Sequence, residues 1–308
     1  AHLDPSKPTV GLMFTANLWI YGNLEHIDAF IRETESQGMN IIPVFFSSVA
    51  SRTDGNEGSV AVVREYFTED GRSRVDAIAM ATPFSQLNNS RDCSGVYTPD
   101  GQNYFHMLTD VPVFQAMSVS SHFADYEESA EGLSKGDFGM NVIWPEVDGQ
   151  IITVPFASNE RGRGGPKVYT PLPDRIRHLV STIGAWARLR RKPASERRIA
   201  ILMYQSRPDS GRIGGAAGLD TMQSVRDMLD RMSSLGYTVD HVPETSRALT
   251  DEILDNITND LEWSSEERVR EKAAAMVPVS DYEPEYGKLS EFNRRRMEES
   301  WGKPPGTV

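Results

Sequence analysis

Residues 9–120 alternate short apolar runs with amphipathic stretches, and this alternation constrains the fold more than any other feature of the sequence. The apolar runs have the length of strands, whereas the intervening stretches repeat apolar residues at helical spacing. Strands that alternate with helices are typical of a parallel sheet covered by helices on both faces. We therefore predict strands at 9–15, 40–48, 76–82 and 112–120, with helices at 24–37 and 58–68.

The rest of the chain continues this pattern less regularly. Residues 140–144 and 151–156, separated by a turn containing Asp-Gly, predict a hairpin or an added edge strand. The polar, Gly- and Pro-rich run at 157–173 predicts a linker, so that a first α/β domain spans 1–156 and a second spans 174–308. In the second domain the expected elements are a helix at 174–193, strands at 199–205 and 237–243, a helix at 221–236 and a helical, charged part from 245 to 300.

Together these elements predict an α/β fold with doubly wound, mostly parallel sheets. Two Rossmann- or flavodoxin-like subdomains are expected, and the second has too few strands for a complete sheet. The polar loop at 83–109 has no role that the sequence defines. The chain begins at Ala1 without Met and ends in a Pro/Gly-rich run, which suggests an internal piece of a longer polypeptide.

Composition excludes several classes of partner. The formal net charge of -12 argues against binding to nucleic acid or to an anionic membrane surface. No run approaches the ~20 apolar residues of a membrane span, and no signal peptide is recognisable. The single cysteine, Cys93, cannot form an internal disulfide. We expect a cytoplasmic protein.

A glycine-rich loop, SGRIGGAAGLD at 210–220, lies between an apolar run and an amphipathic stretch. It lacks the Lys-Ser/Thr ending of a P-loop, and its glycine spacing departs from a dinucleotide fingerprint. One reading is a roomy strand-to-helix turn capped by Asp220 or Thr221. The other is that Gly214, Gly215 and Gly218 let a flat ligand approach the backbone. The hypothesis of a nucleotide-dependent oxidoreductase would rest on this imperfect fingerprint alone.

Six phrases in sequence order resemble the large subunit of the cobaltochelatase and magnesium chelatase family. They are the opening TVGLMFTANLWIYGNLEHIDAFIRETESQGMNIIPVF, VIWPEVDGQI, WARLRRKPASERRIAILMY, GRIGGAAGLD, ITNDLEW and WGKPPG. The glycine loop and ITNDLEW are more similar to the cobalt branch than to the magnesium branch. One departure is Ala81-Thr82-Pro83-Phe84, where the family often has Thr-Gly-Phe.

This resemblance implies a metal chelatase, a ligase that inserts a divalent metal into a tetrapyrrole ring. The substrate metal would be cobalt, with magnesium as the alternative, and the ring a corrinoid or a porphyrin. The resemblance also implies that separate AAA+ partner subunits hydrolyse ATP, so that this chain itself binds no ATP. A fragment of this size is expected to be inactive in isolation.

Metal insertion requires two ring N–H protons to leave, so a carboxylate or imidazole is expected near the ring as a base. Glu146 and Asp148 are candidates because they follow a predicted strand, and open α/β sheets bind ligands at the carboxyl ends of strands. The alternative is a hairpin turn in which Asp148 makes the bend and Glu146 faces water.

The segment after the first strand supplies further candidates. Trp19 and Tyr21 offer aromatic planes to a macrocycle, Asn23 offers a polar contact, and His26 is a possible base one helical turn further on. The alternative makes Asn23 a helix cap and His26 a solvated helix residue.

The spacing of the six histidines and the single cysteine does not match a dedicated metal site. The alternative class of function is a non-catalytic module that docks partner subunits. The acidic charge and the helical C-terminal part of the chain would suit such a module.

Overall fold

The computed structural model describes most of the chain, and contacts divide it into two compact units, residues 1–193 and 194–308. Each unit is described by itself. The residues that the structure describes are 3–47, 58–86, 104–160, 168–204, 213–256 and 265–304. Cys93, most of the loop at 83–109 and the ITNDLEW phrase lie outside the described residues. No helix among the described residues is long and apolar enough to cross a membrane.

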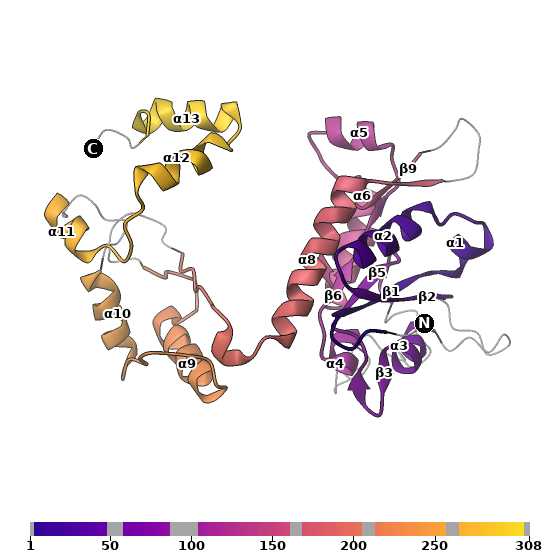
Figure 1. Ribbon diagram of the computed structural model, residues 1–308, viewed down its shortest axis with the longest axis horizontal. Coiled ribbons are helices and arrows are strands. Elements are labelled where there is room, and N and C mark those ends of the chain that lie inside the picture. The colour runs from indigo at the N-terminus through magenta and orange to yellow at the C-terminus, as the bar shows by residue number, and fades with distance from the viewer. Residues whose placement is uncertain are drawn as a thin grey trace. The chain divides into compact units, whose positions relative to one another are not determined.

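The first unit is built on a five-stranded sheet in the order β2-β1-β5-β6-β8, in which every pair of neighbours is parallel (Figure 1). The predicted parallel α/β fold is confirmed. The second strand, β2, lies on one side of β1, and the later strands extend the sheet on the other side of β1, as in flavodoxin-like folds. The strands are β1 (Thr9–Thr15), β2 (Asn40–Phe46), β5 (Ala77–Ala81), β6 (Val113–Gln115) and β8 (Ile151–Ile152).

Helices cover both faces of this sheet, which explains why its strands are continuously apolar. Alternate residues of β1 face opposite sides: Val10 and Leu12 belong to the core beneath α2 and α8, whereas Met13 belongs to the core beneath α3 and α4. A Cβ on Gly11 would lie 2.7 Å from the ring of Phe67, so helix α3 can approach only a glycine there. The helices are α2 (Glu25–Ser36), α3 (Ser59–Phe67), α4 (Phe105–Thr109) and α8 (Pro173–Arg191).

Short elements complete the first unit. The run predicted as one strand at 112–120 splits in two, because its second half leaves the main sheet and joins a three-stranded sheet in the order β10-β9-β7. A small hairpin joins α3 to β5. These elements are α1 (Ala16–Ile20), β3 (Thr68–Glu69), β4 (Arg72–Ser73), β7 (Ser118–Val119), α5 (Phe123–Glu128), β9 (Ala157–Asn159) and β10 (Tyr169–Pro171).

Of the two alternatives predicted for 140–156, the hairpin is wrong, because residues 135–147 are helical, whereas the added edge strand is confirmed as β8 at the end of the main sheet. They form α6 (Lys135–Phe138), a π-helical turn η1 (Gly139–Ile143) and α7 (Trp144–Val147). The buried positions Asp137, Asn141, Pro145 and Asp148 recur at helical spacing. The apolar run MNVIW suggested a buried strand. In the structure, however, the residues of this segment that face inward are mostly polar, and most of the apolar residues face outward.

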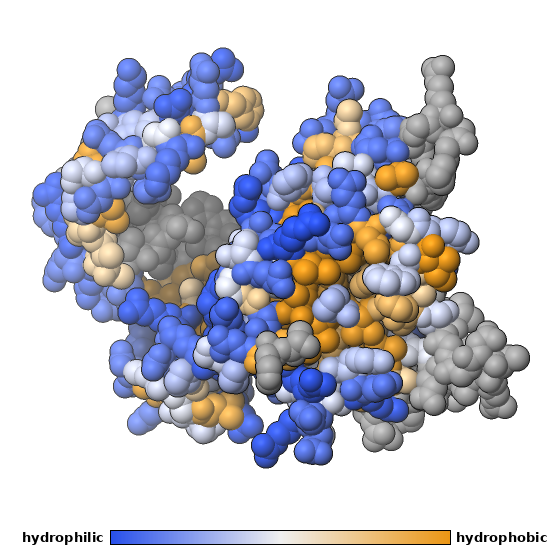
Figure 2. Space-filling view, turned by 45° about the vertical axis from the view of Figure 1, so that its right-hand side comes forward, coloured by the Kyte–Doolittle hydropathy of each residue, from blue (hydrophilic) through white to orange (hydrophobic). Residues whose placement is uncertain are grey.

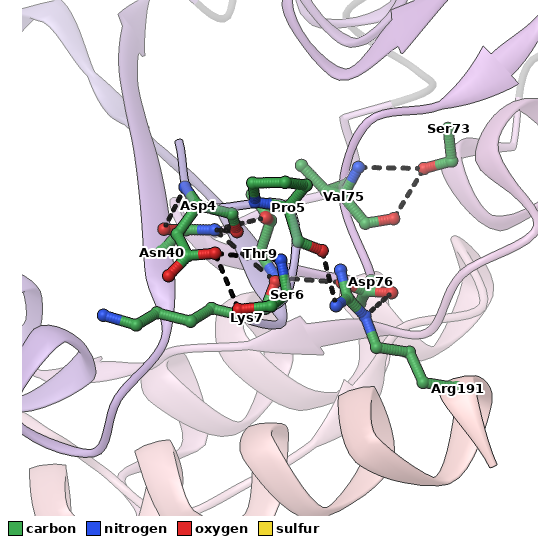
Figure 3. A network of polar contacts seen from close by, with 10 residues as sticks. All are labelled: Asp4, Pro5, Ser6, Lys7, Thr9, Asn40, Ser73, Val75, Asp76 and Arg191. Atoms are coloured by element: carbon green, nitrogen blue, oxygen red, sulfur yellow. Dashed lines mark hydrogen bonds and ion pairs between the residues drawn. The ribbon is translucent and has the colours of Figure 1, made fainter. Parts of the chain in front are cut away.

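The predicted linker at 157–173 is not a boundary between the units. It contributes β9 and β10 to the first unit, and α8 packs in the core of that unit. Figure 3 shows one reason why α8 stays there. The Arg191 guanidinium pairs with the carboxylate of Asp76 at 2.9 Å and donates to the carbonyl of Pro5, while Asp76 accepts the backbone N–H of Thr9.

The described part of the second unit is helical. The strands predicted at 199–205 and 237–243 form no ladder there, and the bridge between Ala216 and Leu219 is isolated. Leu202 is 94% exposed, because an apolar run becomes a buried strand only where neighbours pair with it and cover it. The elements of this unit are η2 (Ala194–Glu196), α9 (Thr221–Ser234), α10 (Ser246–Asp255), α11 (Glu266–Lys272), α12 (Val279–Gly287) and α13 (Glu291–Trp301).

Candidate functional site

A cavity of about 330 Å³ opens at the carboxyl ends of β1, β5 and β6 in the first unit. From β1 the chain first adds β2 on one side of the sheet and then β5 on the other, so the strand order reverses between β1 and β5. Ligands of open α/β sheets bind at such a switch point. Thr15 ends β1, Thr82 follows β5 and Ala116 follows β6, and all three line the cavity. This location makes the cavity, which we call the switch-point cavity, the candidate functional site.

His26 reaches this cavity from the first turn of α2 and is only 1% exposed. Its ring packs between Phe156 and Tyr169, with ring centroids 5.4 and 5.3 Å away. Burial lowers the pKa of His26 to about 4, because the charged imidazolium loses its hydration. The imidazole is therefore neutral near pH 7, and its Nδ1 atom has no hydrogen-bond partner.

Thr82 and Asn141 also line this cavity and add further polar atoms to it. The Thr82 hydroxyl is buried without a hydrogen-bond partner. Gln115, fully buried on β6, donates from Nε2 to the Thr82 carbonyl at 3.3 Å and to Oδ1 of Asn141 at 3.4 Å, and its own Oε1 is unpartnered. Asn141 belongs to the π-helical turn η1, a type of distortion that is frequent at functional sites.

Asp137 contributes the carboxylate of the cavity and is 2% exposed. It accepts hydrogen bonds from the backbone N–H and the hydroxyl of Ser120, the latter at 2.9 Å, and from the hydroxyl of Ser134, also at 2.9 Å. These donors stabilise a buried negative charge without a cationic partner. The described residues that line the cavity include no lysine or arginine.

The predicted substrate-binding residues after β1 lie elsewhere. On α1, Leu18 lines the cavity, whereas Trp19 points away and stacks on Phe45 with ring centroids 5.3 Å apart. Tyr21 is 81% exposed. Asn23 does not cap α2, because its Oδ1 accepts the backbone N–H of Tyr169 at 3.0 Å and so attaches β10 to this corner of the unit.

The predicted carboxylate bases are not brought to the cavity. Asp148 is buried and accepts hydrogen bonds from the Ser85 hydroxyl and from the backbone N–H of Gln86, so its role here is to hold the segment after β5. Glu146 is exposed on α7 and does not line the cavity. Both residues were expected after a strand, and the helical course of 135–147 turns them elsewhere.

The glycine loop belongs to the second unit and forms a turn before α9. Gly214 and Gly218 have φ angles of 70° and 74°, which favour glycine. Gly214 donates its N–H to the Tyr204 carbonyl, and its own carbonyl accepts the Thr221 hydroxyl. Asp220 caps α9 by accepting the N–H of Gln223, as one reading of the sequence predicts. Gly215 is exposed, and no contact joins these glycines to a described pocket.

Of these polar residues that line the cavity, the sequence analysis had proposed His26 and had not proposed Thr82, Asn141 or Asp137. Thr82 directly follows β5, at the end of the strand predicted at 76–82, so its position at the carboxyl end of that strand was a usable signal. Asn141 and Asp137 gave no such signal, since their segment was predicted as a strand. Among the described residues, no group of three or more His, Cys, Asp or Glu side chains is arranged to hold a metal ion.

A larger groove of about 760 Å³ runs along the edge strand β2 and helix α3. Ala16 lines this groove, whereas its neighbour Thr15 lines the switch-point cavity. Phe45 and Tyr66 are exposed at the groove. Figure 2 shows a continuous hydrophobic area on the first unit.

Comparison with known proteins gives a consistent result. The family model described as CobN/Magnesium Chelatase matches residues 1–308. The aerobic cobaltochelatase subunit CobN of Pseudomonas aeruginosa is 27% identical over 99% of this chain, which covers 23% of that protein. The magnesium-chelatase subunit ChlH of Oryza sativa subsp. indica is also 27% identical over 99% of the chain, which covers 20% of it.

A solved structure agrees on the fold. The catalytic subunit of cobaltochelatase from Mycobacterium tuberculosis superposes with a TM-score of 0.71 at 22% sequence identity, over 100% of this chain and 24% of that one. The chain thus spans about a quarter or less of the length of the proteins that it matches.

Proposed function

Because the chain belongs to the CobN/magnesium chelatase family, we propose that it is part of the large, tetrapyrrole-binding subunit of a chelatase that inserts a divalent metal into the ring. The observation that links this proposal to a site is the switch-point cavity, where Nδ1 of the buried neutral imidazole of His26 and the buried hydroxyl of Thr82 have no hydrogen-bond partner. Unpartnered buried polar groups are costly, and a ligand that pairs with them removes the cost.

His26 is the residue to which we assign proton chemistry. A neutral imidazole can accept a hydrogen bond, or transiently a proton, from a group bound beside it. Burial penalises the imidazolium, so the ring would release the proton again quickly. Asp137, next to the cavity, would favour the brief positive charge. Asp148 is excluded from this role by its own hydrogen bonds, and Glu146 could act only on groups outside the cavity.

We favour cobalt as the substrate metal and a corrinoid as the ring. This choice rests on the likeness of the glycine loop and ITNDLEW to the cobalt branch, whereas the relatives include CobN and ChlH at the same identity. Magnesium and a porphyrin are the alternative. We assign ATP hydrolysis to separate AAA+ partner subunits, in line with the glycine loop, whose sequence is not that of a P-loop.

The test is a titration of the chain with a metal-free corrinoid and, separately, with a porphyrin, followed by quenching of its five tryptophans. His26→Phe removes the unpartnered nitrogen and keeps an aromatic ring in place. His178→Phe, on the exposed face of α8, is the matched control. Saturable corrinoid binding that His26→Phe weakens and His178→Phe leaves unchanged supports the proposal.

Failure of both rings to bind would contradict ring binding by this part of the subunit. One observation would then favour the alternative, a module that docks other subunits: the exposed hydrophobic groove along β2. Tighter binding of the porphyrin than of the corrinoid would instead favour magnesium.

A further inference from the structure

A pocket of about 350 Å³ lies within the second unit and is lined by residues of α12 and α13, which run side by side (Figure 1). Tyr286 holds the two helices together, because its hydroxyl donates a hydrogen bond to Oε1 of Glu298 at 2.7 Å. After α13, Gly302 adopts a φ of 78°, and the chain turns so that Pro304 also lines the pocket. The pocket is therefore formed by nearby segments of one unit.

Three aromatic rings line this pocket, which we call the aromatic pocket: Tyr282 and Tyr286 of α12 and Trp301 of α13. The two tyrosines are four residues apart on one helix face, and their ring centroids are 5.9 Å apart. One cation can therefore lie within about 6 Å of both centroids, which is the range of cation–π contacts. Among the described residues of the second unit, arginine guanidiniums lie over Tyr237 and Phe292, and none lies over the rings of the pocket. With Tyr282 37% and Trp301 67% exposed, these aromatic faces are open to a ligand.

The chemistry of the lining favours a cation that needs no hydrogen bonds. Aromatic faces carry partial negative charge, which attracts cations and repels anions, and the Glu298 carboxylate behind Tyr286 acts in the same direction. The described lining residues include no charged side chain, so a primary ammonium would lose its hydration there without gaining an ion pair. A quaternary ammonium has no N–H group to satisfy, and its methyl groups can contact the rings and Met297 directly.

We propose that the aromatic pocket binds a small molecule that carries a methylated, quaternary ammonium group. Recognition of such groups by several aromatic rings is a known use of cation–π contacts. The volume of the pocket is at the lower end of the range for small-molecule sites, about 300–1,000 Å³, and so suits a compact ligand. The net charge of -12 raises the concentration of cations around the chain. The proposal rests on this pocket alone and is independent of the proposed chelatase function.

The experiment compares choline with its neutral isostere dimethylbutanol, in which a carbon atom replaces the positively charged nitrogen and the shape is kept. Each is titrated at constant ionic strength into the intact chain, and the resonances of the backbone amides and tryptophan rings are followed by NMR. Choline should produce saturable shifts at Tyr282 and Trp301. Because the isostere has no charge to interact with the rings, it should bind more weakly by about fivefold or more.

Substitutions assign the binding to the rings. Tyr282→Leu and Trp301→Leu each replace an aromatic face by an apolar side chain and should weaken choline binding about fivefold. Tyr282→Phe keeps the aromatic face and should bind choline nearly as well as the wild type. Trp19→Leu, which removes an exposed tryptophan of the first unit, is the control and should change nothing. Melting curves identify any variant that fails to fold.

Dimethylbutanol binding as tightly as choline would overturn the proposal, since the pocket would then recognise apolar volume and not charge. So would choline binding that both Tyr282→Leu and Trp301→Leu leave unchanged, or no saturable choline shift at Trp301. Phosphatidylcholine vesicles distinguish a free ligand from a lipid headgroup. The chain should not sediment with them, and sedimentation without binding of free choline would also contradict the proposal.

Discussion

The two units of this chain use apolar runs of similar strength in different ways. In the first unit, strand β1 has neighbours on both sides and helices on both faces, so Leu12 is completely buried. In the second, the run at 199–204 has no strand neighbour among the described residues, and Leu202 is almost fully exposed. The difference teaches that an apolar run is a strand only if other segments pair with it and cover it.

The unit with the complete sheet is also the one with the candidate site. A switch point exists only where strands continue on both sides of a central strand, so the order β2-β1-β5 creates the place where His26 and Thr82 meet. In the second unit, by contrast, the glycine loop forms a turn before α9.

The largest expected effect tests the contrast between the two leucines. Leu12→Ala should lower the free energy of unfolding by about 2–5 kcal/mol, because it leaves a cavity in a covered sheet. Leu202→Ala should change it by no more than about 0.5 kcal/mol, as expected for an exposed side chain. Urea denaturation followed by circular dichroism measures both. A large loss for Leu202→Ala would mean that this run is packed in solution like a core strand.

The next effect is a pH dependence confined to the first unit. The pKa of His26 is about 4 in the folded chain and 6.5 ordinarily, so the unfolded chain binds a proton more readily. The stability contributed by neutral His26 is complete above pH 6.5 and falls as the pH drops toward 4, by about 3 kcal/mol in total. Comparing wild type with His26→Phe across this window isolates the effect. Parallel curves for the two proteins would show that His26 is accessible to water.

The smallest effect concerns the attachment of α8 to the first unit. Arg191→Met leaves the buried carboxylate of Asp76 without its guanidinium and should cost about 1–2 kcal/mol, reduced by the partial exposure of Arg191. Arg177→Met, which removes an exposed pair with Asp174 on the same helix, should cost less than about 0.5 kcal/mol. Equal losses in thermal unfolding experiments would mean that the network in Figure 3 contributes little to stability.

Much of the first unit follows from local patterns. The strand at 9–15 and the helix predicted at 24–37, observed at 25–36, agree with the sequence predictions, because each depends on residues close together in the chain. In the second unit, the Asp220 cap of α9 agrees for the same reason. The segment at 135–147 was mispredicted because its buried stripe is polar. A pattern of apolar residues cannot reveal a helix whose inward face serves a cavity.

The candidate site could be predicted only in part. His26 was proposed from its place after the first strand, and it lines the cavity. Trp19, Tyr21 and Asn23 were proposed for the same reason and do not line it. Trp19 stacks on Phe45, Tyr21 is exposed and Asn23 bonds to Tyr169. Glu146 and Asp148 depended on a strand that does not form.

The sequence alone determined the strands at 9–15, 40–48 and 76–82 with the helices between them, the likeness to a chelatase family and the acidic character, because periodicity, motif and charge are written along the chain. Tertiary structure decided where the first unit ends, which apolar runs become strands, and which polar side chains meet around His26. Those outcomes depend on contacts between segments far apart in sequence, such as Arg191 with Asp76 and Gln115 with Asn141. Local patterns carry no record of such contacts, because pairing and burial are properties of the assembled fold.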